Sequence, residues 1–223
     1  KRNFTIVDVD GDGHKLQQYN RLLFCDSKKR IWAGGEMGIS VFNQVGTSLL
    51  PNTDFQIASV LKQAFVNCFY ETSSGYLWIG TRNGLFALKE SDKQFLQYTT
   101  ENGLPSNVIY GILEDAYGRL WISTNQGLSC LNSESGKFRN FTIMDGLQGN
   151  QFNAGAYCRK DNGYMLFGGV NGITSFRPET LIDNPYAPKP VINKLFVHNK
   201  EVLPDDETGI LKESITYVNR ITL

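Results

Sequence analysis

One acidic segment near the start of the chain has the residue types and spacing of a calcium-binding loop. Asp8, Asp10 and Asp12 place carboxylates at alternate positions before a glycine, as the first half of an EF-hand loop does. The ninth and twelfth positions are Leu16 and Tyr19, so the usual closing carboxylate is missing. Acidic, glycine-rich sequence is also ordinary turn chemistry. We therefore predict no bound metal and no cofactor, with these three aspartates as the weak candidates for a metal.

Residues suited to catalysis are few. His14 and His198 are the only histidines, and neither lies in a nucleophile or metal-ligand motif. Glu114 and Asp115 could suggest acid–base work, but adjacent residues of a strand point to opposite faces, and this pair opens a turn. We predict that the segment is not an enzyme.

Amide and guanidinium side chains recur in short turn-like segments between apolar stretches. Such groups offer paired donors and acceptors suited to sugar hydroxyls, although each could instead serve the backbone of its own turn. The candidate ligand-binding residues are Arg82, Asn83, Asn107, Asn125, Gln126, Asn150, Gln151, Asn153 and Asn171.

The elements that must position these residues repeat along the chain. Four segments align without gaps, at residues 29–43, 75–89, 118–132 and 163–177. Each contains an apolar anchor, and the anchors are 46, 43 and 45 residues apart: Trp32, Trp78, Trp121 and Leu166. A glycine follows each anchor by six residues: Gly38, Gly84, Gly127 and Gly172. Agreement at this many positions identifies a structural repeat.

Each repeat predicts four short antiparallel strands. Residues 77–79 are apolar at consecutive positions, as in a strand buried on both faces, and Asn83-Gly84 and Asn171-Gly172 predict tight turns with positive φ. Further strands are expected at 108–113 and 137–144. Four strands per period of about 45 residues are typical of a β-propeller blade, with the tryptophans packed between blades. The candidate ligand-binding loops should then open on one face.

The two ends of the chain depart from the repeat. Residues 3–8 nearly repeat residues 140–145, which predicts the outer strand of a blade whose inner strands precede Lys1. After Phe176, prolines interrupt the pattern, and strands are expected again at 191–197, 201–203 and 214–223. We therefore predict propeller blades over 1–181, a proline-rich connector over 182–190, and an incomplete second β domain over 191–223, all within a longer protein.

Composition adds few constraints. The 22 basic and 22 acidic residues balance, which argues against nucleic acid or an anionic membrane as a partner of this segment. Four widely spaced cysteines do not form the close pairs typical of metal sites, and we expect free thiols: Cys25, Cys68, Cys130 and Cys158.

The stretch from Val108 to Leu128, V-x-x-I-x-E-D-x-x-G-x-L-W-I-x-T-x-x-G-L, resembles the two-component regulator propeller repeat, and the loop at 102–107 is also typical of it. Residues 146–181 resemble the closing blade of that family, in which the last anchor is usually not tryptophan. Residues from Pro190 resemble the first hairpin of the Y_Y_Y domain.

The resemblance implies an all-β fold: four blades of a seven-bladed propeller, forming an open arc rather than a closed four-bladed ring, plus the first strands of an immunoglobulin-like β-sandwich. It implies the periplasmic sensor region of a hybrid two-component sensor histidine kinase that detects an oligosaccharide. The implied partners are the rest of its own propeller, its Y_Y_Y domain and a second copy in a homodimer. The alternatives are a non-catalytic scaffold for protein–protein interaction and a polysaccharide-active propeller enzyme.

Prolines at 185, 188 and 190 fix φ and restrict the residues before them, which predicts a stiff connector. A stiff connector could transmit a shift of the last blade to the following domain, whereas a Gly/Ser connector would absorb it.

Overall fold

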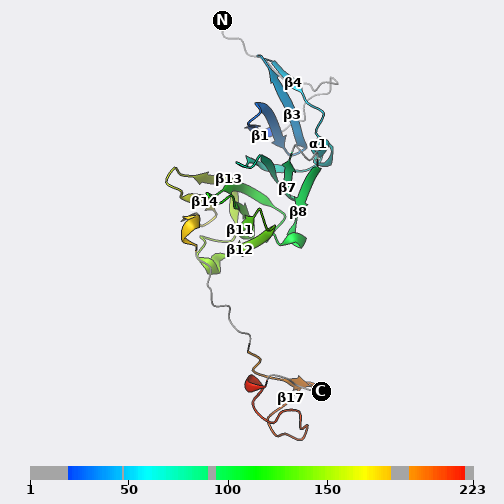
Figure 1. Cartoon of the computed structure of the whole chain (residues 1–223), viewed down its shortest axis with the longest axis vertical. Coiled ribbons are helices and arrows are strands. Elements are labelled where there is room, and N and C mark those ends of the chain that lie inside the picture. The colour runs from blue at the N-terminus through cyan, green and yellow to red at the C-terminus, as the bar shows by residue number, and fades with distance from the viewer. Residues whose placement is uncertain (1–19, 47, 90–93, 182–190, 219–223) are drawn as a thin grey trace. The chain divides into compact units, whose positions relative to one another are not determined.

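The computed structural model describes residues 20–46, 48–89, 94–181 and 191–218 (Figure 1). The chain divides into two compact units, Lys1–Leu181 and Ile182–Leu223. The expected outer strand at 3–8, the acidic loop with Asp8, Asp10 and Asp12, and the connector at 182–190 lie outside the described residues.

The first unit consists of antiparallel sheets that follow one another in chain order, each with its strands in sequence order. The first sheet contains β1 (Asn20–Cys25), β2 (Arg30–Gly35), β3 (Gly38–Val45) and β4 (Ser48–Pro51). The second contains β5 (Val66–Glu71), β6 (Tyr76–Thr81), β7 (Gly84–Lys89) and β8 (Gln94–Tyr98). The third contains β9 (Ile109–Glu114), β10 (Leu120–Thr124), β11 (Gly127–Asn132) and β12 (Lys137–Phe141). The prediction of four-stranded blades is confirmed for these three sheets.

The fourth sheet has three strands among the described residues, one fewer than predicted: β13 (Phe152–Arg159), β14 (Met165–Gly169) and β15 (Gly172–Phe176). Pro178 follows almost directly and begins a 3₁₀ turn, η4 (Pro178–Thr180). A proline ring fixes φ and removes the backbone donor that a further strand would need, so the chain leaves the sheet here.

The helical segments between the described sheets of the first unit are short. A helix, α1 (Gln56–Val60), connects the first two sheets, and the 3₁₀ turns η2 (Thr100–Asn102) and η3 (Ile143–Asp145) follow β8 and β12. The strand expected over 137–144 therefore ends at Phe141. Thr142 and Asp145 form a capping box, which satisfies backbone donors locally and ends the strand.

Apolar cores form between successive sheets. Trp32 packs with residues of the first and second sheets, Trp78 with the second and third, and Trp121 with the third and fourth. All three indole rings are buried, which confirms their predicted role in packing between blades. Burying a large aromatic side chain contributes about 2–3 kcal/mol, so the anchors are a main source of cohesion between sheets.

An aspartate six residues before the anchor organises the first turn of two sheets. Asp26 accepts hydrogen bonds from the Trp32 indole N–H (2.9 Å), the Arg30 side chain (2.5 Å) and the backbone N–H groups of Arg30 (2.8 Å) and Lys28 (3.0 Å). Burial alone would raise the pKa of Asp26, but the Trp32 and Arg30 hydrogen bonds and the Arg30 charge outweigh it and lower the pKa below 3.8. Asp115 repeats this arrangement in the third sheet.

The second sheet lacks this aspartate. Thr72 occupies the position and binds only within its own turn, accepting from the Tyr76 N–H at 3.1 Å. Among the described residues, the buried Trp78 indole N–H has no acceptor. A buried donor without a partner costs about 1–3 kcal/mol.

Restoring the aspartate and arginine should therefore stabilise the second sheet. We expect Thr72→Asp combined with Tyr76→Arg to raise the free energy of unfolding by about 1 kcal/mol, because the new carboxylate would accept from Trp78. Thr72→Asp alone should be less stable than the pair of substitutions, since it buries an unpaired charge. Urea denaturation measures the difference. If adding Trp78→Phe to the double variant leaves the gain intact, the new indole hydrogen bond is not its source.

A second polar contact at the first turn ties the first sheet to the second and the second sheet to the third. The Glu71 carboxylate accepts from the backbone N–H and hydroxyl of Ser27, both at 2.7 Å. The Glu114 carboxylate accepts in the same way from Ser73, at 2.9 Å for both bonds. Glu114 thus faces the preceding sheet while Asp115 faces its own turn, and the structure gives this pair a scaffold role.

No disulfide joins the four cysteines, all of which lie in the described part of the chain. Cys68 and Cys130 lie in the cores between sheets, and burial raises the pKa of the Cys68 thiol to about 12. A thiol that stays protonated is a poor nucleophile, so Cys68 serves as a small core side chain.

The second unit contains a two-stranded hairpin, β16 (Phe196–Val197) and β17 (Lys200–Glu201). His198 and Asn199 both have positive φ, 50° and 64°, as a two-residue hairpin turn requires. The strand expected from residue 214 is wrong over its described part, because residues 215–217 form the 3₁₀ turn η5 (Ile215–Tyr217). That turn buries Ile215 against Val202 and Leu211. The likeness to a Y_Y_Y domain stays a prediction.

Candidate functional site

The loops that carry the candidate residues meet at one end of the sheets, which we call the entry face. It comprises the turns between second and third strands (36–37, 82–83, 125–126 and 170–171) and the loops that lead into the innermost strands (62–65, 99–108 and 142–151). The Gly84 N–H donates to the Asn107 carbonyl at 2.8 Å, and the Gly127 N–H to the Asn150 carbonyl at 2.6 Å. Each turn is thus fastened to the loop that enters the next sheet.

Glycine recurs at this position because two backbone segments lie very close together there. Gly84 has φ +118° and Gly127 has φ +117°, and a Cβ at either would lie 2.6 Å or 2.3 Å from a carbonyl oxygen of the adjacent outer strand. The two central residues of the turn, such as Arg82 and Asn83, have negative φ. The expectation that Asn83-Gly84 and Asn171-Gly172 both take positive φ is therefore wrong for the asparagines. Glycine is needed beside the turn, where the backbones approach each other.

The side chains of two candidate asparagines form hydrogen bonds with the backbone of their own loops. The Asn107 side-chain oxygen accepts from the Thr100 N–H at 2.8 Å, and the Asn150 side-chain oxygen accepts from the Ile143 N–H at 2.8 Å. Both bonds satisfy the first free donor of a 3₁₀ turn. These side-chain oxygens are therefore committed to the scaffold.

Asn83 and Gln126 expose their side chains at the entry face, and Asn153 exposes its side chain at the start of β13, directly after the loop 142–151. The backbone N–H groups of Asn83 and Gln126 donate to the hydroxyl groups of Thr81 and Thr124, at 2.9 Å and 3.0 Å, and these bonds fix the two turns. Among the described residues, the side-chain amides of Asn83, Gln126 and Asn153 have no hydrogen-bond partner. Asn125 differs, because its side-chain oxygen is buried without a partner in the described part of the chain.

The fourth sheet builds its turn differently. Gln148 accepts from the Asn171 N–H at 2.8 Å and donates to the Gln151 carbonyl at 3.3 Å. The sequence pattern did not predict a role for Gln148. The equivalent position in the preceding repeat is Pro105, so the repeat pattern does not point to an amide side chain there. Comparing the two loops position by position would have identified the substitution.

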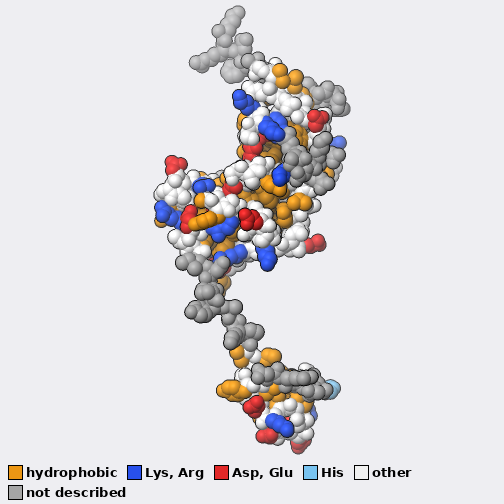
Figure 2. All heavy atoms as spheres, in the orientation of Figure 1, with side chains coloured by type: hydrophobic (Ala, Val, Ile, Leu, Met, Phe, Trp, Pro, Cys, Tyr) orange, Lys and Arg blue, Asp and Glu red, His pale blue; other side chains and the backbone are white. Residues whose placement is uncertain are grey.

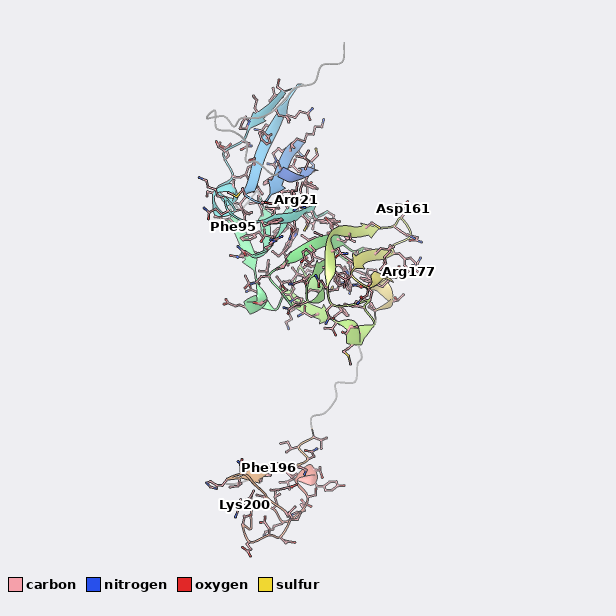
Figure 3. The ribbon with its side chains drawn as sticks, turned by 180° about the vertical axis from the view of Figure 1, so that it is seen from behind. Arg21, Phe95, Asp161, Arg177, Phe196 and Lys200 are labelled. Carbon is pink, nitrogen blue, oxygen red and sulfur yellow. The ribbon has the colours of Figure 1, made fainter. Side chains whose placement is uncertain are left out.

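A cationic cluster joins the first and second sheets. The Arg82 guanidinium lies 3.7 Å from the centroid of the Phe65 ring, and the Arg21 guanidinium lies 5.8 Å from the same centroid. Arg21 also pairs with Glu36 at 3.6 Å. Of these four residues the sequence predicted only Arg82, since the others lie on different elements. Figure 3 labels Arg21 where the first sheet meets the second.

The described residues of the entry face carry no metal cluster. No group of three or more His, Cys, Asp or Glu side chains there could hold a metal ion. On the face seen in Figure 2, basic and acidic side chains are interspersed. No described helix is long and apolar enough to cross a membrane. The geometry supports binding through amide and guanidinium groups.

Comparison with known families identifies the repeat. Residues 61–83 and 103–126 match the family model described as two component regulator propeller. These two segments are therefore similar in sequence to two-component regulator propeller repeats. The matched residues include Trp78 and Trp121, the two anchors at the centre of the second and third blades, together with the turns at 82–83 and 125–126.

One relative and one solved structure match most or all of this chain. The chain is 30% identical over 230 residues to Histidine kinase P4 of Formosa agariphila, a match that covers all of this chain and 17% of that protein. It matches the extracellular domain of the hybrid two-component system BT3049 from B. thetaiotaomicron with a TM-score of 0.71 and 24% identity, covering 90% of this chain and 28% of that one.

A further match is the extracellular domain of the one-component system BT4673 from B. thetaiotaomicron, with a TM-score of 0.55 and 25% identity over 71% of this chain and 24% of that one. The chain thus spans less than a third of each of these relatives. The all-β propeller fold is shown by these structures.

Proposed function

We propose that this chain is part of the periplasmic ligand-sensing region of a hybrid two-component sensor histidine kinase, and that its ligand is an oligosaccharide. The regulator propeller repeats, a relative named as a histidine kinase and structural neighbours named as extracellular domains of such systems support the sensing role. In this proposal the segment binds without catalysis, and the remainder of its propeller, a Y_Y_Y domain and a second copy complete the receptor.

One observation at the entry face carries the proposal: some residues hold the loop backbones in place, while others expose their side chains. Asn107, Asn150 and the repeated glycines build the same hydrogen-bonded frame in successive blades. Exposed polar side chains on that frame differ from blade to blade, as at the equivalent positions Glu36 and Arg82. A fixed frame with varied polar side chains suits recognition of a ligand with many hydroxyl groups.

A glycan array followed by calorimetry tests the proposal. We expect the chain to bind at least one class of oligosaccharide, and Gln126→Ala and Asn153→Ala to weaken binding about three- to tenfold each, as loss of one or two hydrogen bonds does. Ser133→Ala, at the opposite end of the third sheet where Ser133 donates to the Gly118 carbonyl, is the matched control.

Three outcomes would contradict the proposal. Absence of binding to every saccharide class would favour the scaffold for protein partners. Binding that Gln126→Ala and Asn153→Ala leave intact would remove the entry face as the site. Release of cleaved sugar would indicate a polysaccharide-active enzyme.

A further inference from the structure

We propose that Arg21 and Arg82 form a site for an acidic saccharide, one whose sugar carries a carboxylate or a sulfate group. This inference rests on the proposed function and specifies the charge of the ligand. Its basis is the pair of guanidinium groups that two different sheets bring to the ring of Phe65 at the entry face.

The contact with Phe65 restrains Arg82. Its guanidinium lies 3.7 Å from the ring centroid, while its backbone N–H donates to the Phe65 carbonyl at 3.0 Å. A guanidinium packed on an aromatic ring keeps its N–H groups available to an acceptor. Because the side chain is already held, binding an anion costs less conformational entropy than it would for a freely rotating arginine.

The charges of the cluster are not balanced by the described residues. Arg21 and Arg82 bring two positive charges to one ring, and Glu36 is the carboxylate that pairs with Arg21, at 3.6 Å. Within the described part of the chain no carboxylate pairs with Arg82. Since like charges at short range repel, an anion bound between them would relieve that repulsion.

The cluster is not required by the blade architecture. The positions equivalent to Arg82 in the other repeats are Glu36, Asn125 and Val170, and those equivalent to Phe65 include Val108 and Asn153. Glycine recurs at the same place in all four repeats, whereas this pairing of arginine with an aromatic ring occurs in the second. A feature that the fold does not need is a candidate for recognition.

The donor geometry selects the ligand class. A guanidinium presents a planar fork of N–H donors that matches a carboxylate or a sulfate. Asn83, next to Arg82 in the same turn, has an exposed side chain that can serve the hydroxyl groups of the sugar. An acidic saccharide combines both kinds of group, whereas a neutral one would leave the two cations unmatched.

The test uses three matched sugars as probes: galactose, galacturonate and galactose 6-sulfate. They are titrated into the ¹⁵N-labelled chain, and the arginine side-chain Nε–H signals are followed by NMR. We expect galacturonate, galactose 6-sulfate or both to shift the Arg21 and Arg82 signals saturably, and galactose to leave them in place. The two acidic arms distinguish a carboxylate from a sulfate ligand.

Charge variants make the test specific. Arg82→Gln should weaken binding of the acidic sugar about tenfold, the effect of losing a charge-assisted hydrogen bond. Glu36→Gln should strengthen it about twofold, because it frees Arg21 from a surface pair. Lys137→Gln, which removes a positive charge at the opposite end of the third sheet, is the matched control and should change nothing.

Two results would overturn the inference: equal shifts with galactose and the acidic sugars, or no saturable shift with either acidic sugar. Neither result bears on whether the array detects a neutral oligosaccharide, so the proposed function can survive the loss of this site. Absence of any saccharide binding on the array would instead remove the proposed function itself.

Discussion

Replacing Gly127 with alanine is expected to lower the free energy of unfolding by about 3–5 kcal/mol, through backbone strain of about 1–3 kcal/mol and a steric clash of similar size. At φ +117° an L side chain is strained, and the new Cβ would lie 2.3 Å from the Phe141 carbonyl oxygen. The Gly127 N–H also donates to the Asn150 carbonyl, so a displaced turn would lose its bond to the next blade. Urea denaturation followed by tryptophan fluorescence measures the loss.

Gly172 provides the matched control. It holds the same place in the fourth repeat with φ +127°, but a Cβ there would meet nothing within 4 Å. Gly172→Ala should therefore cost only the backbone strain, about 1–3 kcal/mol. If the two substitutions cost the same, the close approach of the outer strand is not the reason that glycine recurs at this position.

Much of the fold could be predicted from the repeat, because a blade is built from local patterns. A buried strand with consecutive apolar residues around Trp78 or Trp121, a turn and a glycine at a fixed distance specify neighbouring antiparallel strands. The fourth blade departed from the prediction at Pro178, where a backbone property rather than the apolar pattern decided the outcome.

The candidate site could be predicted only in part. Sequence patterns placed Arg82 and Gln126 on turns of one face, but could not separate Asn107 and Asn150, which hold their own loops, from residues that face solvent. Arg21 and Phe65 are 44 positions apart in the sequence, and their contact joins the first sheet to the loop that enters the second. Side-chain contacts across blades depend on packing that no local pattern encodes.

The second large effect on stability is expected at Asp115, the aspartate in the first turn of the third sheet. Asp115→Ala should lower the free energy of unfolding by about 3–5 kcal/mol, because the buried carboxylate accepts four hydrogen bonds, one of them from the charged Arg119 side chain. One Asp115 oxygen accepts from the N–H groups of Tyr117 and Arg119 at 2.9 and 3.0 Å. The other accepts from the Arg119 side chain at 2.7 Å and the Trp121 indole at 3.0 Å. Alanine would strand the indole N–H in the core between the third and fourth blades.

Two further substitutions separate the contributions of this aspartate. Asp115→Asn keeps an acceptor for the turn but loses the charge, and should cost about 1–2 kcal/mol, as loss of a charge-assisted bond does. Thr72→Ala removes the equivalent side chain where Trp78 already lacks an acceptor, and should cost about 1 kcal/mol, the value of an ordinary hydrogen bond. If Asp115→Ala proved no more costly than Thr72→Ala, the indole bond would contribute nothing. The aspartate six residues before a tryptophan would then be only a turn residue, and the gain expected for the second blade from Thr72→Asp with Tyr76→Arg would lose its physical basis.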